Sequence, residues 1–134
     1  MVARRSGRIV MIASISGHHV WSRRVAYSSS KAGVVGLMKA CAIDLAAHGI
    51  TCNAVSPLPI ETPQTATLRG PVIREQVIAR TPMARYGRAD EIADVIAFLA
   101  SDDARFVTGH ELVIDGGLTS AAILYELRKY TQSS

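Results

Sequence analysis

Short apolar runs flank one long segment in which apolar residues recur every three or four positions. The run Arg8–Ser14 lies between Gly7 and Gly17 and is almost continuously apolar, which is typical of a strand buried on both faces of a parallel sheet. Residues 26–47 have helical spacing of apolar side chains, and Ile50–Ser56 is a second apolar run. This order predicts a strand, a long helix and a second strand, joined by a right-handed crossover.

The remainder of the chain predicts further helices and one more strand. Pro57, Pro59 and Pro63 follow the second apolar run and predict a loop without regular structure. Beyond this loop, the pattern predicts a small helix at 71–80, an amphipathic helix at 89–100, a strand at 111–114 and a tail helix at 121–129. We therefore expect an α/β protein with a partial doubly wound parallel sheet of about three strands and flanking helices.

Composition describes a globular chain of 134 residues, with 49% hydrophobic and 19% charged residues. The net charge is +4, but the later arginines are interspersed with acids, which favours a solvated mixed-charge surface over a nucleic-acid site. No run has the roughly 18 apolar residues of a membrane span, and Ile9–Ala13 is too short for a signal peptide. Cys41 and Cys52 lack metal-site or redox-motif spacing. We expect a cytoplasmic protein with reduced cysteines, without a metal, nucleic acid or membrane partner.

Three polar residues form a pattern with a specific chemistry. Tyr27 and Lys31 stand one turn apart on the same face of the predicted long helix, and Ser14 ends the strand before it. A lysine ammonium within about 4–6 Å favours the ionised form of a phenol, which is otherwise a poor base at neutral pH. A serine at the carboxyl end of a parallel strand lies where such sheets bind ligands, and its hydroxyl can bond a substrate oxygen. Together, these three side chains are suited to proton transfer between an alcohol and a carbonyl. A nicotinamide would supply or accept the hydride, which side chains cannot provide.

Each of the three residues also has a purely structural interpretation. Tyr27 alone is a core aromatic with a hydrated hydroxyl, and Lys31 alone is a surface residue whose stem covers apolar atoms. Ser14 alone is a hydroxyl that caps local backbone at the end of a strand. Taken singly, the structural interpretation is favoured at each position. Their occurrence together in this order favours catalysis.

The segments around these residues resemble the active-site half of the short-chain dehydrogenase/reductases. The resemblance is carried by Ala13-Ser-Ile-Ser-Gly17, Tyr27-Ser-Ser-Ser-Lys-Ala-Gly33, Gly49-Ile-Thr-Cys-Asn-Ala-Val-Ser-Pro57, Thr62-Pro63, Arg80-Thr-Pro-Met-Ala-Arg-Tyr-Gly-Arg88, Phe98-Leu-Ala-Ser-Asp-Asp103, Thr108-Gly109 and Asp115-Gly-Gly117. It covers about Gly7 to Gly117 in order and spacing. It implies a single truncated Rossmann-like domain of residues 1–134, with 118–134 as a C-terminal extension.

The resemblance also implies a role for each residue of the pattern. Tyr27 would be the general acid/base, Lys31 would favour its phenolate and bind the nicotinamide ribose, and Ser14 would polarise the substrate carbonyl. The implied cofactor-binding residues are Tyr27, Lys31, Pro57, Ile60 and Thr62. The implied substrate-binding residues are Ser14, Ile15, His19, Trp21, Tyr27 and Leu58. The loop from Leu58 to about Arg80 would close over the substrate.

Several features depart from the family pattern. The nucleotide-binding half with its glycine-rich turn is not among these residues, so the choice between NAD and NADP cannot be read. Leu58 stands where glycine is usual, and its side chain is expected to crowd the cofactor or change the turn. Ala13 replaces a residue that is usually polar. Without a neighbour, the first strand would leave an open sheet edge, which predicts low stability, association or aggregation.

Two functions remain open at this point. The first is an NAD(P)-dependent oxidoreductase that interconverts an alcohol and a carbonyl by hydride transfer assisted by Tyr27, Lys31 and Ser14. The second is a non-catalytic member that retains only an association surface. Expected partners are a small alcohol or carbonyl substrate and other subunits, either in a homodimer or tetramer or with full-length relatives.

Overall fold

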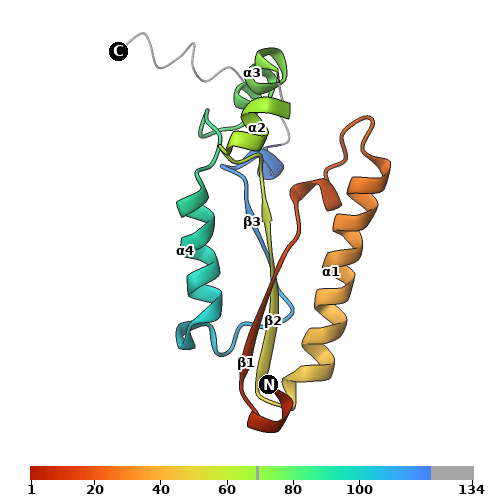
Figure 1. The fold of residues 1–134 in the computed structure, drawn as a ribbon, viewed down its shortest axis with the longest axis vertical. Coiled ribbons are helices and arrows are strands. Elements are labelled where there is room, and N and C mark those ends of the chain that lie inside the picture. The colour runs from red at the N-terminus through yellow and green to blue at the C-terminus, as the bar shows by residue number, and fades with distance from the viewer. Residues whose placement is uncertain (69, 122–134) are drawn as a thin grey trace.

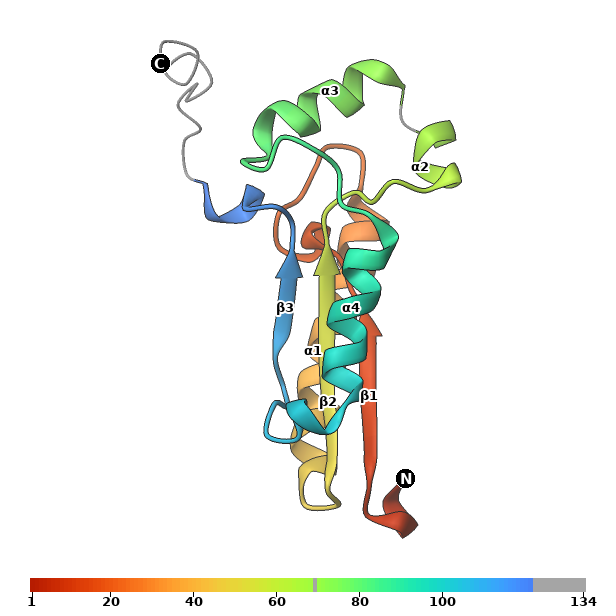
Figure 2. The ribbon, with the colours of Figure 1, turned by 90° about the vertical axis from the view of Figure 1, so that its left-hand side faces the viewer.

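The computed structural model describes residues 1–68 and 70–121. Three parallel strands form one sheet in the order β1-β2-β3, with bounds Gly7–Ile12, Ile50–Pro57 and Glu111–Ile114. The long helix α1, Val25–Ala46, covers one face of the sheet, and α4, Ala89–Ala100, covers the other (Figures 1 and 2). This arrangement confirms the predicted α/β fold, and the two sheet faces account for its two main apolar clusters.

The first cluster lies between the sheet and α1. Met38 and Ala42 of the helix pack with Cys52 and Ala54 of β2, while Ile9 of β1 lies at the margin. Met38 belongs to the apolar stripe that the sequence predicts, and Ala42 lies one turn farther along the same face. Cys41 and Cys52 are free thiols, and burial, followed by the nearby Cys41, raises the pKa of the Cys52 thiol.

The second cluster lies between the sheet and α4. Val55 of β2 packs with Ile92 and Leu99 of the helix, and Val10 of β1 reaches the same cluster. Because successive strand residues point to opposite faces, Ala54 and Val55 contribute to different clusters. The central strand is consequently buried from Ile50 to Ser56.

The first strand is less covered than the sequence predicts. β1 lies at the edge of the sheet, and its residues 7–11 are only half-buried, while Ile12 is exposed. Its apolar run is suited to burial on both faces, but α1 packs mainly on the central strand β2, so the β1 surface is covered chiefly on the side of α4. Among the described residues, no strand pairs with the outer edge of β1.

Two helices lie beyond the carboxyl ends of the strands (Figure 2). They are α2, Pro63–Leu68, and α3, Pro71–Arg80. The prediction of a loop without regular structure is wrong at Pro57, which ends β2, and at Pro63, which begins α2. A proline fits the first position of a helix, where its missing N–H has no partner to lose.

Other predicted elements agree closely with the structure. α3, α4 and β3 have their predicted bounds, and α1 begins and ends one residue early. Short 3-10 helices add η1 (Val2–Arg4), η2 (Ile15–Gly17), η3 (Asp102–Ala104) and η4 (Leu118–Ser120). The helix predicted for 121–129 lies, after its first residue, outside the described residues. Within the part that the structure describes, no helix combines the length and the apolar character needed to cross a bilayer.

Candidate active site

A cavity of about 350 Å³ opens where β1 and β2 end. Ser14 reaches it from the segment after β1, and Tyr27 and Lys31 reach it from the first two turns of α1. Parallel strands place their carboxyl ends at one edge of the sheet, which is why residues distant in sequence meet here. The remaining predicted residues that line the cavity are Ile15, Trp21, Pro57, Leu58, Ile60 and Thr62.

Tyr27 and Lys31 lie together as their spacing predicts. The Lys31 Nζ is 5.8 Å from the centroid of the Tyr27 ring, and it donates a hydrogen bond of 3.0 Å to the carbonyl oxygen of Ile12. This bond ties α1 to the end of β1. An ammonium has three donors, so two remain for other partners. The Tyr27 side chain stays accessible, since the residue is 41% exposed.

Ser14 is held at the cavity wall by the short helix that follows it. Its backbone is extended, and its Oγ accepts a hydrogen bond of 3.2 Å from the N–H of Ser16. Gly17 ends η2 against α1: a Cβ at this position would lie 3.1 Å from the backbone nitrogen of Ala32. A side chain there would therefore push η2 away from the helix that carries Tyr27.

The segment after β2 is fixed by one threonine that no motif identifies. Thr65 Oγ1 donates to the Ile60 carbonyl oxygen at 2.6 Å, and the Thr65 N–H donates to Thr62 Oγ1 at 3.1 Å. Thr62 thereby caps the start of α2. The N–H of Ile60 has no hydrogen-bond partner among the described residues. An amide donor beside a hydroxyl at the cavity wall fits a carboxamide, which offers both an acceptor and a donor.

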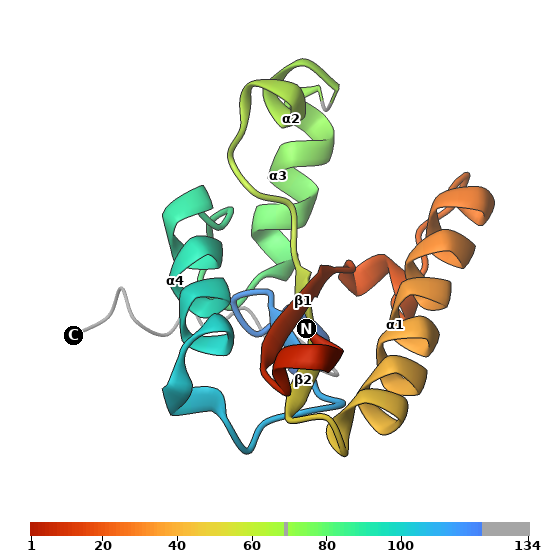
Figure 3. The ribbon, with the colours of Figure 1, turned by 60° about the horizontal axis from the view of Figure 1, so that its bottom comes forward.

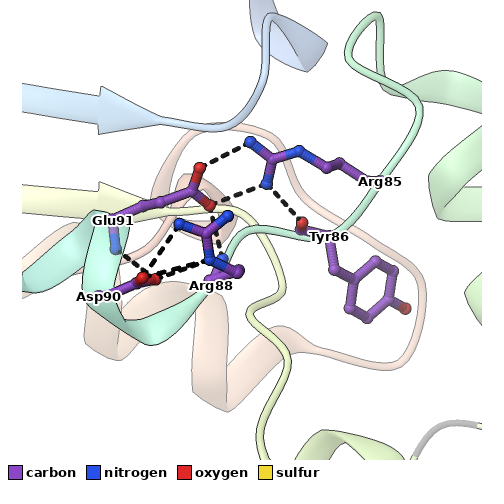
Figure 4. A network of polar contacts seen from close by, with 5 residues as sticks. All are labelled: Arg85, Tyr86, Arg88, Asp90 and Glu91. Atoms are coloured by element: carbon purple, nitrogen blue, oxygen red, sulfur yellow. Dashed lines mark hydrogen bonds and ion pairs between the residues drawn. The ribbon is translucent and has the colours of Figure 1, made fainter.

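A charged network fixes the loop that supports Ile60 (Figure 4). Gly87 forms a bridge with Ile60, and the N–H of Glu61 donates to the Gly87 carbonyl at 2.9 Å. On either side of Gly87, Arg85 donates two hydrogen bonds of 2.8 and 2.6 Å to the Glu91 carboxylate, and the Arg88 N–H donates one of 2.7 Å. The Glu91 carboxylate thus holds the loop and also caps the N-terminus of α4, which begins at Ala89.

The same network predicts a pH dependence of stability. The hydrogen bonds from Arg85, and then the N–H of Arg88, lower the pKa of Glu91 from 4.5 to about 2. Because the folded state binds this proton less tightly, the carboxylate stabilises the fold above pH 4.5, and its contribution is lost as the pH falls toward 2. We expect Glu91→Gln to flatten the fall in unfolding free energy over this interval, measured by denaturant titration at a series of pH values.

Asp94→Asn provides the control for this prediction. Asp94 is exposed on the same helix, and no described residue pairs with its carboxylate. This variant should keep the wild-type slope between pH 4.5 and 2. A Glu91→Gln profile parallel to that of the wild type would contradict the proposed role of the Glu91 carboxylate.

Leu58, for which crowding near the cofactor or a changed turn is expected, lies beneath α3 and also lines the cavity. Its side chain is only 3% exposed and packs with Ile15, Val77 and Tyr86 beneath α3. Its N–H donates to the Ile114 carbonyl at 2.9 Å, and its φ angle is not positive. Leucine is accommodated because the apolar cluster under α3 receives the side chain, even though one edge of it lines the cavity.

One predicted site residue lies outside the cavity lining. His19 is exposed, and its ring makes an edge contact with His18 at a centroid distance of 5.2 Å. The lining also includes residues that sequence reasoning missed, namely Ile12, Ala13, Ser16, Pro59, Gln64 and Thr65. The spacing of Thr62, Pro63 and Thr65 at a helix start was the available signal for Thr65.

Comparison with known proteins identifies a matching family and several similar proteins. A family described as Enoyl-(Acyl carrier protein) reductase matches residues 1–119. The chain is 45% identical over 121 residues to 2-(R)-hydroxypropyl-CoM dehydrogenase of Xanthobacter autotrophicus, covering 90% of this chain and 48% of the relative. It is 44% identical over 118 residues to 3-oxoacyl-[acyl-carrier-protein] reductase FabG of Thermotoga maritima, and this match covers 88% of this chain and 48% of the relative. The chain thus spans about half the length of these relatives.

A solved structure has the same arrangement. The gluconate 5-dehydrogenase from Burkholderia cenocepacia J2315, in complex with NADP and tartrate, matches with a TM-score of 0.86 and 34% identity. The match covers 90% of this chain and 48% of that protein. At this identity and TM-score, the strands and helices around the cavity correspond in the two proteins.

Proposed function

From the membership of this chain in the short-chain dehydrogenase/reductase family, we propose that it forms the catalytic part of an NAD(P)-dependent oxidoreductase interconverting an alcohol and a carbonyl. The observation that carries this proposal is the single cavity lined by Ser14, Tyr27 and Lys31. The activity of the relatives belongs to chains about twice as long, so the cofactor and substrate of this chain are part of the proposal.

The residues would divide the chemistry as follows. In the reducing direction, the Ser14 hydroxyl hydrogen-bonds the substrate carbonyl oxygen, and the Tyr27 hydroxyl donates its proton to that oxygen. The Lys31 ammonium, 5.8 Å from the ring centroid, stabilises the phenolate left behind. In the oxidising direction the phenolate takes the proton back from the alcohol. A bound nicotinamide supplies or accepts the hydride, which no side chain can do.

The site residues fit a nicotinamide nucleotide. The Ile60 N–H and the Thr62 hydroxyl would hold the carboxamide, and the remaining Lys31 donors would hold ribose hydroxyls. The solved gluconate 5-dehydrogenase contains NADP, which supports a nicotinamide nucleotide here without deciding between NAD and NADP.

A chimera tests the proposal directly. In it, this chain replaces the matching segment of the Thermotoga maritima reductase, to which it is 44% identical. We expect the chimera to oxidise or reduce nicotinamide in the presence of members of a panel of short hydroxy and keto compounds, followed by absorbance. A folded chimera that binds NADPH yet turns over no compound would contradict the proposal.

Association with other subunits is the second candidate, and exposed apolar residues on α1 favour it. Val25, Leu37 and Ile43 are 80%, 57% and 78% exposed on the helix that covers one face of the sheet. Sedimentation of the chain alone, with and without NADPH, separates the two functions. A stable oligomer whose melting temperature does not respond to NADPH would favour association alone, whereas a raised melting temperature would favour the enzyme.

A further inference from the structure

A second cavity, of about 810 Å³, adjoins the candidate active site. It lies between the segment 20–24 and α3, and we call it the arginine cavity because Arg23, Arg24 and Arg80 line it. Trp21 belongs to the lining of both cavities, so the two meet at this indole. A substrate held at Ser14 can therefore extend past Trp21 into the arginine cavity.

The three arginines have no counter-charge in the part of the chain that the structure describes. Among residues 1–68 and 70–121, no carboxylate lines the arginine cavity, and none of the three guanidiniums makes an ion pair. Cations gathered without acids repel one another, so a bound anion would stabilise the arrangement. By contrast, four other arginines each pair with a carboxylate: Arg8, Arg74, Arg85 and Arg88.

The start of α1 adds positive potential at the same place. Arg24 is the N-cap of this 22-residue helix, no side chain caps its N–H groups, and its first turn contains no acid. The N-terminus of such a helix attracts anions through its free N–H groups and its dipole. Arg23 has a left-handed backbone with φ of 61°, a conformation that costs energy for a residue with a side chain. The three arginines and the N-terminus of α1 therefore lie at the same cavity.

Resting on the proposed function, we infer that the substrate carries an anionic group, a carboxylate, sulfonate or phosphate, which binds in the arginine cavity. Its reacting carbon lies at Ser14 and Tyr27. The Arg24 guanidinium carbon is 5.5 Å from the centroid of the Tyr27 ring, so the anion binds close to the reacting centre. The substrates expected from this inference are short keto acids and hydroxy acids, or their sulfonate and phosphate counterparts.

Binding of a matched ligand pair tests the inference without turnover. The probes are 4-oxopentanoate and its neutral methyl ester, which share the ketone and differ in charge. Trp21 is the single tryptophan of the chain, so its fluorescence reports binding at the junction of the cavities. We expect the wild-type chain to bind the ion about tenfold more tightly than the ester, the factor of one charge-assisted contact.

Arginine variants identify the source of that preference. Arg24→Gln and Arg80→Gln should each bring the affinity ratio of ion to ester close to one, with little change for the ester. Arg105→Gln is the matched control, because Arg105 follows η3 at the opposite end of the sheet and should leave the ratio unchanged. Added salt should weaken binding of the ion only.

Three results would overturn the inference. These are equal affinity for the ion and the ester, no binding of the ion, and a preference that survives in both Arg24→Gln and Arg80→Gln. None of them concerns proton transfer by Tyr27, which is judged from turnover of the chimera. Failure of the anion site and failure of the oxidoreductase function are therefore distinguished by different measurements.

Discussion

Tyr27→Phe should lower the turnover of the chimera by about 10²- to 10⁴-fold, the usual contribution of a positioned proton donor. The substitution removes the hydroxyl and keeps the ring against which the Arg24 and Lys31 cations lie, at 5.5 and 5.8 Å from its centroid. NADPH binding should therefore change little, because Lys31 keeps its hydrogen bond to the Ile12 carbonyl. Steady-state rates and a fluorescence titration with NADPH measure the two quantities separately.

Ser29→Ala is the control for this experiment. Ser29 is exposed two residues farther along α1 and does not line the cavity. The chimera that carries Ser29→Ala should fold, bind NADPH and turn over substrate at the rate of the unmodified chimera. Retained turnover in Tyr27→Phe would refute the acid/base assignment, while loss of turnover together with loss of NADPH binding would indicate a structural role for the hydroxyl.

The main elements of the fold follow from periodicity, because their burial is regular. Helical spacing over α4 predicts the face that contacts Val55, and the bounds Ala89–Ala100 agree with the structure. The half-burial of β1 does not follow from its apolar run, which suits a strand covered on both faces, but it agrees with the open sheet edge expected from the family resemblance. The start of α2 was missed because Pro63 was interpreted as a breaker, although proline is favoured at a first helical position.

Only those cavity residues that belong to a recognisable sequence motif could be predicted. Ser14, Tyr27 and Lys31 are recognisable by order and spacing, and the structure brings them to one cavity. The arginine cavity is not visible in the sequence, since Arg80 comes from α3 and Arg24 from the start of α1. Whether an arginine is paired also depends on the fold, because partners such as Arg8 and Asp102 are 94 residues apart. Local patterns do not contain such distant contacts.

A buried amide contributes to the fold in a way that the motifs also did not reveal. Asn53 lies on β2 with none of its surface exposed. Its Nδ2 donates to the Val107 carbonyl at 2.8 Å, and its Oδ1 accepts from the His110 N–H at 3.1 Å. These bonds hold the segment that leads into β3. The β3 strand begins at Glu111, directly after this segment.

We expect Asn53→Leu to lower the unfolding free energy by about 1–3 kcal/mol, because it removes both hydrogen bonds of the buried amide and leaves the half-buried Val107 carbonyl without this donor. Denaturant unfolding at one fixed protein concentration measures this loss, since any association changes apparent stability. Thr51→Val is the matched control on the same strand. The Thr51 hydroxyl is buried and has no hydrogen-bond partner among the described residues, so its replacement by a methyl group should be neutral or stabilising. A similar loss in both variants would show that strand packing, and not the amide bonds, determines stability here.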